Sequence, residues 1–252
     1  MRDCMGVNFC HPSTYNKGNR TPHVMIAVSA DTYFYPPRPE NACSPAQIGV
    51  YEADGWWAQT KFDGTCGVFT VSADGRVRKA MTRHGSNKPM VRWTATPEHF
   101  EHLASLCDQR DPSAINVFVG EVLHGRVKAK HLAKTPIIIH DILVHNGKHL
   151  FQSKYGMRFK AYLAPLAEKG KMLDTHYELT DRVGIIRNVG CELSSFYYDL
   201  ERKRKWFPEY EGVVLKNPNA RLEPCTRQSA NSSWQIKSRF PTDKDGVLRR
   251  SF

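Results

Sequence analysis

The chain has 252 residues, of which 40% are hydrophobic and 24% charged, and it is long enough to bury a full core. It contains neither an apolar stretch of about 18 residues nor a signal-peptide core, which excludes membrane-spanning and secreted classes and predicts a soluble, intracellular, cytoplasmic protein. Lys and Arg outnumber Asp and Glu by 36 to 25, and the net charge of +11 favours a polyanionic partner.

Cysteine usage is also typical of an intracellular protein. The seven cysteines form an odd set without a CxxC pair, so the sequence predicts reduced thiols rather than a disulfide framework or a zinc ribbon.

The N-terminal part of the chain is rich in turn formers. The stretches at 14–23 and 33–45 contain several Pro, Gly and Asn residues. We therefore predict an irregular arm or lobe, residues 1–46, that packs on a body formed by residues 47–252.

From about residue 47 the pattern becomes strand-like. Most of the predicted strands alternate polar and apolar residues or run apolar over four to eight positions. Ala73-Asp74-Gly75 and Asn146-Gly147 are turn signals at strand ends. The predicted strands are 55–64, 65–72, 76–83, 115–125, 136–148, 211–217 and 234–240.

Helical patterns interrupt these strands. Residues 96–109 begin with Thr96 as N-cap and Pro97 at the first helical position, and weaker helical patterns cover 155–164 and 194–206. Hairpin-type connections between most strands favour an α+β fold with a largely antiparallel sheet and flanking helices.

One short motif raises a chemical question. Lys61 opens the sequence KFDG, and by itself this would be a solvated strand-end lysine followed by the turn pair Asp63-Gly64. Five further motifs follow it in order: TRHG (82–85), FVGEVLHG (118–125), HDILVHNGK (140–148), EGVVLK (211–216) and WQIKSRF (234–240).

In this order the motifs resemble those of the covalent nucleotidyltransferases, which comprise the ATP-dependent DNA and RNA ligases and the mRNA capping enzymes. The resemblance covers residues 57–240 and implies the nucleotidyltransferase, or adenylyltransferase, fold. It also implies that Lys61 is the catalytic nucleophile that becomes covalently bound to AMP, and that Lys216 and Lys237 contact the α-phosphate. A lysine attacks only when unprotonated, so its usual pKa of about 10.4 must be lowered by desolvation or neighbouring cations.

The resemblance assigns two glutamates as well. Glu121 and Glu211 match the family's glutamates, of which the first contacts the ribose and the second lies near the metal. Mg²⁺ is a hard ion that prefers oxygen ligands, so both are predicted magnesium ligands, with Mn²⁺ as a substitute. Taken alone, each would be a strand-end glutamate in a salt bridge.

The same matching predicts further nucleotide-binding residues. Arg83 would hold the ribose or the incoming phosphate end, and Asp63 would hold the loop or a metal-bound water. The remaining members of the predicted nucleotide-binding set are Thr60, Gly64 and Arg239.

Two positions depart from the family pattern. His140 stands where ligases often have an aromatic residue, and it either stacks on the base or is a satisfied core histidine. Arg239 replaces the second lysine of a Lys-x-Lys motif, which keeps the charge.

The sequence KFDGTC narrows the resemblance. It is similar to the small ATP-dependent RNA ligases that include the vertebrate 5′-to-3′ RNA ligase and viral and bacterial relatives. The chain ends twelve residues after Phe240, so we expect no OB domain of the kind that capping enzymes use. The expected activity is a monomeric, ATP-dependent RNA ligase acting on RNA with 5′-phosphate and 3′-hydroxyl ends. Alternatives are a minimal DNA ligase, a GTP-dependent capping guanylyltransferase and a non-catalytic RNA-binding module.

Other patterns allow a structural or a functional interpretation. We predict that the pairs His99/His102 and His145/His149 are surface histidines rather than zinc ligands, and that Cys66 is a small buried side chain without a catalytic role. The basic run 201–207 is either a phosphate-contacting helix end or a solvated face, and an exposed Trp206 would favour nucleic acid. We expect residues 1–46 to cover the nucleotide or RNA face.

Overall fold

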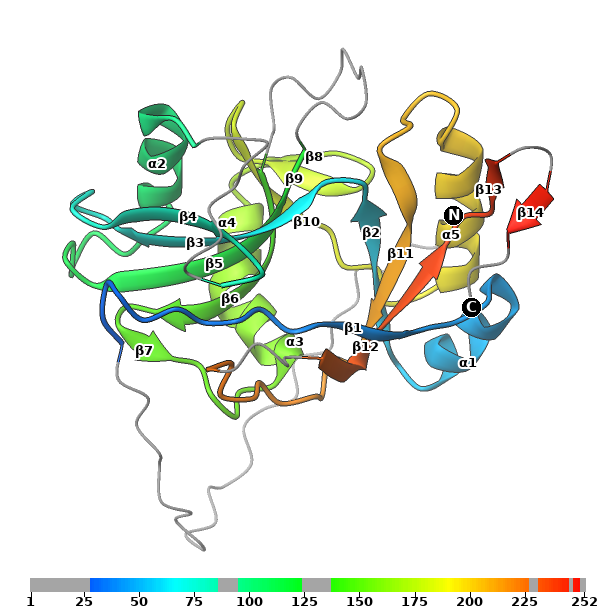
Figure 1. The fold of residues 1–252 in the computed structure, drawn as a ribbon, viewed down its shortest axis with the longest axis horizontal. Helices are drawn as coiled ribbons and strands as arrows, with labels where there is room; N and C mark the ends of the chain where they lie inside the picture. Colours follow the sequence, from blue (N-terminus) through cyan, green and yellow to red (C-terminus); the bar gives the residue numbers. More distant parts are fainter. Residues whose placement is uncertain (1–27, 86–94, 124–136, 227–230, 245–246, 250–252) are drawn as a thin grey trace, which may run out of the picture.

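The computed structural model describes residues 28–85, 95–123, 137–226, 231–244 and 247–249, and these form two sheets with helices on their outer sides (Figure 1). The smaller sheet has the order β1-β12-β11-β2. Its strands are β1 (Arg38–Ala42), β12 (Asn231–Arg239), β11 (Tyr210–Lys216) and β2 (Trp57–Phe62). β1 runs parallel to β12, and the other two pairs are antiparallel.

The larger sheet has the order β4-β3-β5-β6-β10-β9-β8, and β7 pairs with β6 at its edge. Its strands are β3 (Thr65–Ser72), β4 (Arg78–Thr82), β5 (Ile115–Val122), β6 (Ile137–His145), β7 (Lys148–His149), β8 (Lys171–Met172), β9 (His176–Glu178) and β10 (Val183–Ile186). Its pairs are antiparallel except for β6 with β10. β13 (Thr242–Lys244) and β14 (Val247–Arg249) form a separate hairpin. The predicted mixture of helices with a largely antiparallel arrangement is confirmed.

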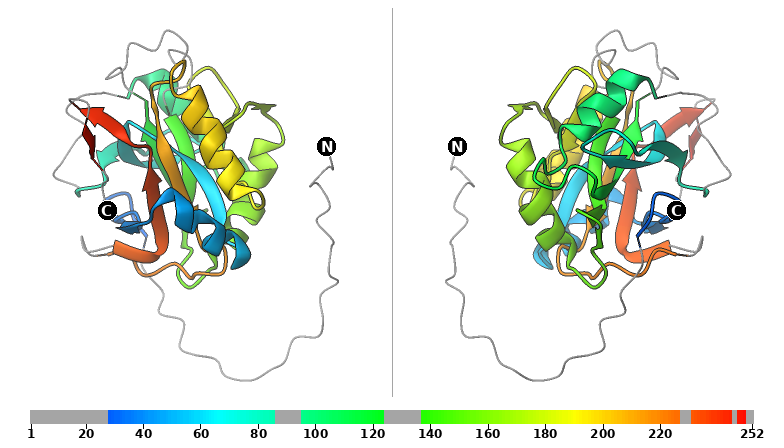
Figure 2. Two further views of the ribbon diagram at one scale, coloured as in Figure 1. Left: turned by 90° about the vertical axis from the view of Figure 1, so that its right-hand side faces the viewer. Right: turned by 90° about the vertical axis from the view of Figure 1, so that its left-hand side faces the viewer.

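Helices cover the outer faces of both sheets. They are η1 (Pro45–Gln47), α1 (Ile48–Ala53), α2 (Pro97–Ala104), α3 (Tyr155–Arg158), η2 (Phe159–Leu163), α4 (Ala164–Ala167) and α5 (Leu193–Lys203). α5 lies across the outer face of the small sheet and contacts α1 (Figure 2). The remaining longer helices pack on the large sheet. None of the helices in the described ranges is long and apolar enough to cross a membrane.

The core lies between these layers. β5 and β6 carry nearly continuous runs of buried apolar side chains, such as Val117–Val119 and Ile137–Ile139. Both faces of these strands are covered, one by helices and one by the small sheet, and a strand buried on both faces favours such runs over strict alternation.

The segment 33–42, here called the crossing segment, connects the large sheet to the small one across the front of the molecule (Figure 1). Tyr33 donates its hydroxyl proton to the Thr82 carbonyl in β4. Phe34 is 1% exposed and stacks on His149, with ring centroids 4.6 Å apart. The segment then becomes β1 and pairs with β12.

The structure corrects several expectations from the sequence. The strand-like pattern expected from about residue 47 begins later, because residues 48–53 form α1, in which Val50 is 62% exposed. α2 ends at Ala104, five residues before the predicted end at 109. β1 and the short strands β8, β9 and β10 were not predicted, because β1 pairs with the distant β12 and the other three are only two, three and four residues long. The boundary at 46/47 stays a prediction, and residues 1–27 lie outside the described ranges.

Candidate active site

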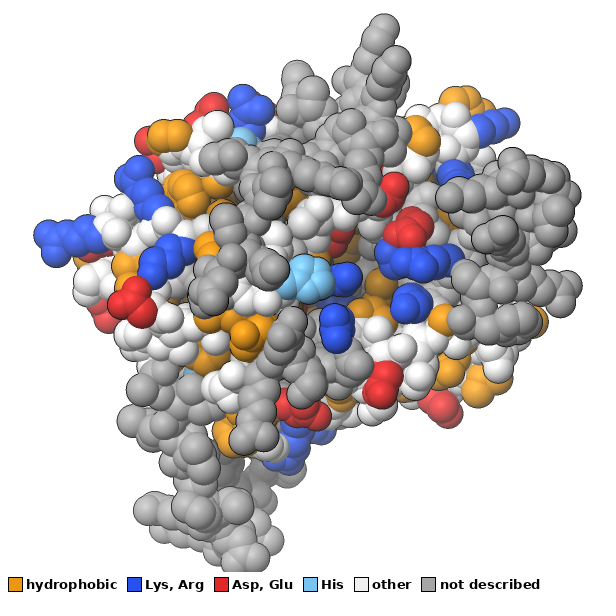
Figure 3. Space-filling model, in the orientation of Figure 1, with side chains coloured by type: hydrophobic (Ala, Val, Ile, Leu, Met, Phe, Trp, Pro, Cys, Tyr) orange, Lys and Arg blue, Asp and Glu red, His pale blue; other side chains and the backbone are white. Residues whose placement is uncertain are grey.

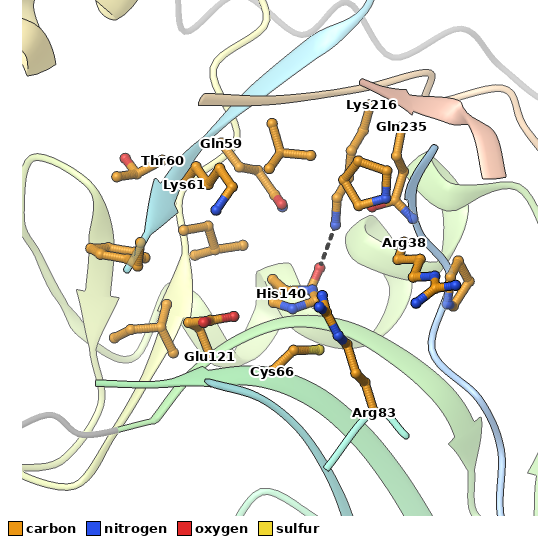
Figure 4. Close-up of a pocket in the computed structure, with 16 residues that line it drawn as sticks. Arg38, Gln59, Thr60, Lys61, Cys66, Arg83, Glu121, His140, Lys216 and Gln235 are labelled. Atoms are coloured by element: carbon orange, nitrogen blue, oxygen red, sulfur yellow. Dashed lines mark hydrogen bonds between the residues drawn. The ribbon is translucent and has the colours of Figure 1, made fainter. Parts of the chain in front are cut away.

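A pocket opens between the inner faces of the two sheets, and we call it the inner pocket (Figure 4). Its small-sheet side carries Gln59, Thr60, Lys61, Lys216 and Gln235, and its large-sheet side carries Cys66, Arg83, Glu121 and His140. A second cavity, the polar chamber, adjoins it and shares Lys61, Cys66, Arg83 and Glu121. The polar chamber is completed by Asp63, Gly64, His84, Glu211 and Arg239.

The register of the small sheet explains why the predicted cations meet. Cross-strand partners in a sheet share a face. Lys61 pairs with Gly212, which pairs with Arg239, and Lys216 pairs with Gln235. Lys237 lies between Gln235 and Arg239 on β12. Side chains two residues apart along a strand share a face, so all three lie on the same face. The inner face of this sheet therefore presents the predicted catalytic lysines together.

A β-bulge brings Glu211 to the same face. Tyr210 pairs with Phe62 and Gly212 pairs with Lys61, so Glu211 is the extra residue between them. Gly212 has φ +148°, and a Cβ atom there would lie 2.1 Å from the Ser238 carbonyl oxygen. The Glu211 carboxylate accepts one hydrogen bond from Lys61 Nζ and another from Arg239 Nε, the latter at 2.8 Å. Glu211 and Gly212 thus form a bulge that turns the Glu211 carboxylate towards Lys61, the predicted nucleophile.

The turn after Lys61 also requires a glycine. A Cβ atom on Gly64 would lie 2.5 Å from the Val122 carbonyl oxygen and 2.8 Å from Glu121 Cγ. Because Gly64 has no side chain, the connection from β2 to β3 can pass directly against β5. This close approach brings Lys61 and Glu121 into one site although they belong to different sheets.

Lys216 lies deep in the inner pocket. Its residue is 2% exposed, its Nζ donates a hydrogen bond to the His140 carbonyl at 3.3 Å, and it lies 4.6 Å from the centre of the Tyr155 ring. Burial lowers the pKa of Lys216 to about 8, while the nearby Asp141 carboxylate opposes this shift. Burial and the neighbouring cations Arg239 and Lys61 also lower the pKa of Lys237.

The large-sheet side of the pocket holds groups that are mostly neutral. Burial raises the pKa of Glu121 to about 8, although the nearby Lys61 and Arg83 oppose the shift. Burial also raises the pKa of the Cys66 thiol to about 12 and lowers that of His140 to about 3. Among the described residues no group hydrogen-bonds to His140 Nδ1. His140 lines the pocket, and its role as a stacking partner stays a prediction.

The carboxylates of the polar chamber form a suitable donor set for a hard cation. Asp63, Glu121 and Glu211 all line this chamber and offer oxygen atoms, which Mg²⁺ and Mn²⁺ prefer. Glu121 keeps its proton at neutral pH because its pKa is raised, so Asp63 and Glu211 are the better donors. Glu211 would then exchange one of its cationic partners for the metal.

Three residues of the inner pocket with a charged or amide side chain were not predicted as site residues from the sequence. Gln59 is 3% exposed, and its amide Nε2 donates to Tyr155 Oη at 2.6 Å and to Asn188 Oδ1 at 3.0 Å. Arg38 enters the pocket from β1, and Gln235 from β12. The period of two along β2 and β12 was a usable signal for Gln59 and Gln235. The sequence carried no such signal for Arg38, because β1 itself was not predicted.

The other histidine and tryptophan predictions have mixed outcomes. The prediction of a surface position is wrong for His99, which is 5% exposed and whose Nδ1 lies 2.7 Å from Thr96 Oγ1 in the cap of α2. His145 is half-buried and stacks on Tyr162 at 4.3 Å. Trp206 is 60% exposed, with Lys205 Nζ 3.8 Å from the centre of its ring.

Cationic side chains gather on the face of the molecule onto which the site opens. Figure 3 shows Lys and Arg side chains near the middle of this face, between the two sheets, with acidic side chains beside them. Such a surface attracts phosphate groups.

No protein-family model matches the sequence, and no curated protein matches it. In structure, the chain is similar to the ligase domain from M. tuberculosis LigD, with a TM-score of 0.51, 16% identity, and coverage of 82% of this chain and 59% of that chain. It is also similar to mycobacterial DNA ligase D complexed with ATP and MES, with a TM-score of 0.52, 17% identity, and coverage of 82% and 61%. The chain spans about three fifths of the length of these two neighbours. Its two sheets and flanking helices therefore have the fold of ligase nucleotidyltransferase domains.

Proposed function

We propose that the chain is an ATP-dependent RNA ligase that joins 5′-phosphate and 3′-hydroxyl ends through a lysyl-AMP intermediate. The observation that carries this proposal is the position of Lys61, in contact with Glu211 and at the border of the inner pocket and the polar chamber. A nucleotide bound across both cavities would present its α-phosphate to this amine.

In the first step, Lys61 Nζ loses a proton and attacks the α-phosphorus of ATP. A nitrogen–phosphorus bond forms, the bond from the α-phosphorus to the bridging oxygen breaks, and pyrophosphate leaves. Glu211 contacts Lys61 Nζ in the free site, and once Glu211 holds the metal the released proton passes to solvent. Lys216, Lys237 and Arg239 would neutralise the charge on the phosphates, which is the main demand of phosphoryl transfer. Mg²⁺ bound to ATP supplies further neutralisation, and Asp63 and Glu211 would hold it.

The hydrogen bonds of Gln59 favour ATP over GTP. Tyr155 and Asn188 use its amide Nε2, so Oε1 is left as an acceptor at the wall of the inner pocket. Adenine carries an amino donor where guanine carries a carbonyl acceptor. A fixed acceptor therefore pairs with adenine and repels guanine, which argues against the capping alternative.

In the later steps, AMP passes to the 5′-phosphate of a strand, and the neighbouring 3′-hydroxyl displaces AMP to form the phosphodiester bond. The net charge of +11 and the exposed Trp206 support a nucleic-acid substrate, and the sequence KFDGTC supports RNA. DNA is the second candidate, because both structural neighbours come from DNA ligase D proteins. Contacts to the 2′-hydroxyl would make the distinction. We propose that the chain acts as a monomer.

The test incubates the purified protein with magnesium and α-labelled ATP or GTP and resolves it on a denaturing gel. We expect a covalent label from ATP in the wild type and in Lys79→Ala, whose lysine pairs with Asp31 outside both cavities, but none in Lys61→Ala. Matched RNA and DNA nicks with a 5′-phosphate then separate the two substrates. Label from GTP would support the capping alternative, and absence of label from folded protein would disprove the enzymatic proposal.

A further inference from the structure

Three side chains on the large-sheet wall of the inner pocket combine a soft, a borderline and a hard metal donor. Cys66 Sγ, a carboxylate oxygen of Glu121 and a ring nitrogen of His140 all lie within 4.8 Å of one another. The nucleotidyl transfer described above requires no thiol, so Cys66 has no role in that chemistry.

The pairing of neighbouring strands creates the cluster. Cys66 on β3 pairs directly with Glu121 on β5, so their side chains share the pocket face. The pairing of β5 with β6 shifts in register between Val119 and Gly120 of β5, and His140 of β6 is the extra residue between their partners. The three donors thus come from three adjacent strands of one sheet, which hold them more rigidly than loops would.

We propose that Cys66, Glu121 and His140 form a binding site for a thiophilic divalent cation, with Zn²⁺ as its probe. Thiolate, imidazole and carboxylate are the ligands that Zn²⁺ uses, and three protein ligands with one open position are a common arrangement. The ligand distances of about 2.0–2.3 Å put ligand atoms roughly 3.5 Å apart, so the side chains must close by about 1 Å. Mg²⁺ prefers oxygen donors and does not compete for a thiol.

The charge balance of the pocket permits Zn²⁺ to replace two protons. In the metal-free pocket, the Cys66 thiol and the Glu121 carboxyl both keep their protons at neutral pH, because burial raises the pKa of each. When Zn²⁺ binds, the S–H and O–H bonds break, the zinc–sulfur and zinc–oxygen bonds form, and two protons pass to solvent. His140 contributes a nitrogen lone pair as a neutral ring. The two positive charges of Zn²⁺ replace those of the two released protons. The net charge near Lys61, Arg83 and Lys216 therefore does not change.

The consequence for activity rests on the proposed function. Glu121 and His140 line the pocket that would receive ATP, so the bound cation and the nucleotide compete for one space. Zn²⁺ is therefore expected to inhibit lysine adenylylation, and a chelator is expected to restore it.

The direct test is independent of catalysis. The full chain, reduced and free of metal, is titrated with Co²⁺, whose bonds to thiolate give a charge-transfer band in the near ultraviolet. We expect one equivalent of Co²⁺ to produce the band, Zn²⁺ to abolish it by displacement, and Mg²⁺ to leave it unchanged. Cys66→Ser should lose the band, and Glu121→Gln and His140→Ala should weaken Co²⁺ binding by at least the roughly 10- to 100-fold typical of lost metal-site partners.

Two variants serve as matched controls. His102→Ala disrupts the other described grouping of metal-binding types, Glu98, His102 and Asp181, and should keep the band. Cys191→Ser removes an exposed thiol elsewhere and should keep it as well. Persistence of the band in folded Cys66→Ser, or its loss in Cys191→Ser, would overturn the proposal.

A second arm measures inhibition of adenylylation by Zn²⁺ in the wild type and Cys66→Ser, each relative to its own rate without zinc. The wild type should be inhibited at a Zn²⁺ concentration at least about tenfold lower than the variant. Equal inhibition of both would contradict the proposal. If neither protein forms a lysyl nucleotide, the proposed function fails, while the Co²⁺ titration still decides the metal site.

Discussion

At the scale of the residue, Gly212 decides what its neighbour Glu211 can do. Its φ of +148° and the 2.1 Å approach of a hypothetical Cβ to the Ser238 carbonyl leave no room for a side chain. Without the bulge, β11 would keep a regular register, and Glu211 would no longer turn towards Lys61.

We therefore predict that Gly212→Ala abolishes most lysine adenylylation and destabilises the fold by a few kcal/mol, on the order of other strained-backbone changes. The label assay and urea unfolding measure the two effects. Gly49→Ala is the control, because a Cβ atom at Gly49 has no neighbour within 4 Å in the described structure, and it should leave both readouts near wild type. Wild-type labelling by a folded Gly212→Ala protein would refute the role given to the bulge.

Glu121 should make stability depend on pH. Its pKa is raised from 4.5 to about 8, so between these values the folded state binds more protons than the unfolded state. Stability contributed by the protonated group is then present at low pH and is lost as the pH rises towards 8. Glutamine cannot titrate, so Glu121→Gln should gain thermal stability relative to wild type on going from pH 5 to pH 8. Thermal unfolding at several pH values measures this, with the exposed Glu168→Gln as a control that should follow wild type.

At the scale of the element, an ion pair ties α3 to β6 under the inner pocket. Arg158 and Asp141 have side chains that are 0% and 4% exposed, and Arg158 donates from Nε at 3.1 Å and from Nη2 at 2.9 Å. The pair holds the strand that carries His140, and the Asp141 carboxylate also favours the charged form of Lys216.

Removing one partner leaves the other buried and uncompensated. Arg158→Met should cost about 3–5 kcal/mol of unfolding free energy, whereas Arg158→Met with Asp141→Leu should recover part of that loss. Urea denaturation measures both. Arg76→Met breaks an ion pair whose arginine side chain is 86% exposed, and it should change stability by less than about 1 kcal/mol. A single variant as stable as the double variant would show that the pair does not carry this role.

The site residues on β2, β5, β11 and β12 could be predicted from the sequence, whereas β1 could not. Lys61, Glu121, Glu211, Lys216 and Arg239 lie around one pair of adjoining cavities, as the resemblance of the ordered motifs to a known family implied. Their individual chemical roles stay predictions. β1 and the position of Arg38 could not be predicted, because the pairing partner of β1 lies about 190 residues away.

One further prediction was wrong, and one further set of contacts was not predicted. The helical pattern after Thr96 was correct, but His99 was expected at the surface, although it forms part of the helix cap and is buried. The orientation of the Gln59 amide depends on Tyr155 and Asn188, and no spacing rule connects these three positions.

At the scale of the whole molecule, the crossing segment joins the two walls of the site. Because it supplies buried Phe34 and strand β1, deletion of residues 1–46 should remove core contacts and a sheet edge together. We predict that this deletion lowers thermal stability strongly and abolishes adenylylation. Deletion of residues 1–27 leaves all contacts among the described residues in place, so adenylylation should persist.

The shorter deletion tests the expected cover over the nucleotide or RNA face. If residues 1–27 belong to that cover, end joining should fall more than adenylylation. An equal loss of both activities in folded protein would contradict this expectation. Thermal unfolding, the covalent label and a nick-sealing assay on the same preparations provide the comparison.

The interleaving of the two sheets has a consequence for synthesis. The large sheet comes from residues 65–186, whereas the small sheet combines strands before and after that stretch, and Lys61 meets Glu211 across 150 positions. Translation proceeds from the N-terminus, so the ribosome has released most of the large sheet before β11 and β12 exist. The amine and its carboxylate partner can meet only after Glu211 has left the ribosome. A fragment from interrupted translation would thus carry the KFDG sequence without the carboxylate partner of its lysine.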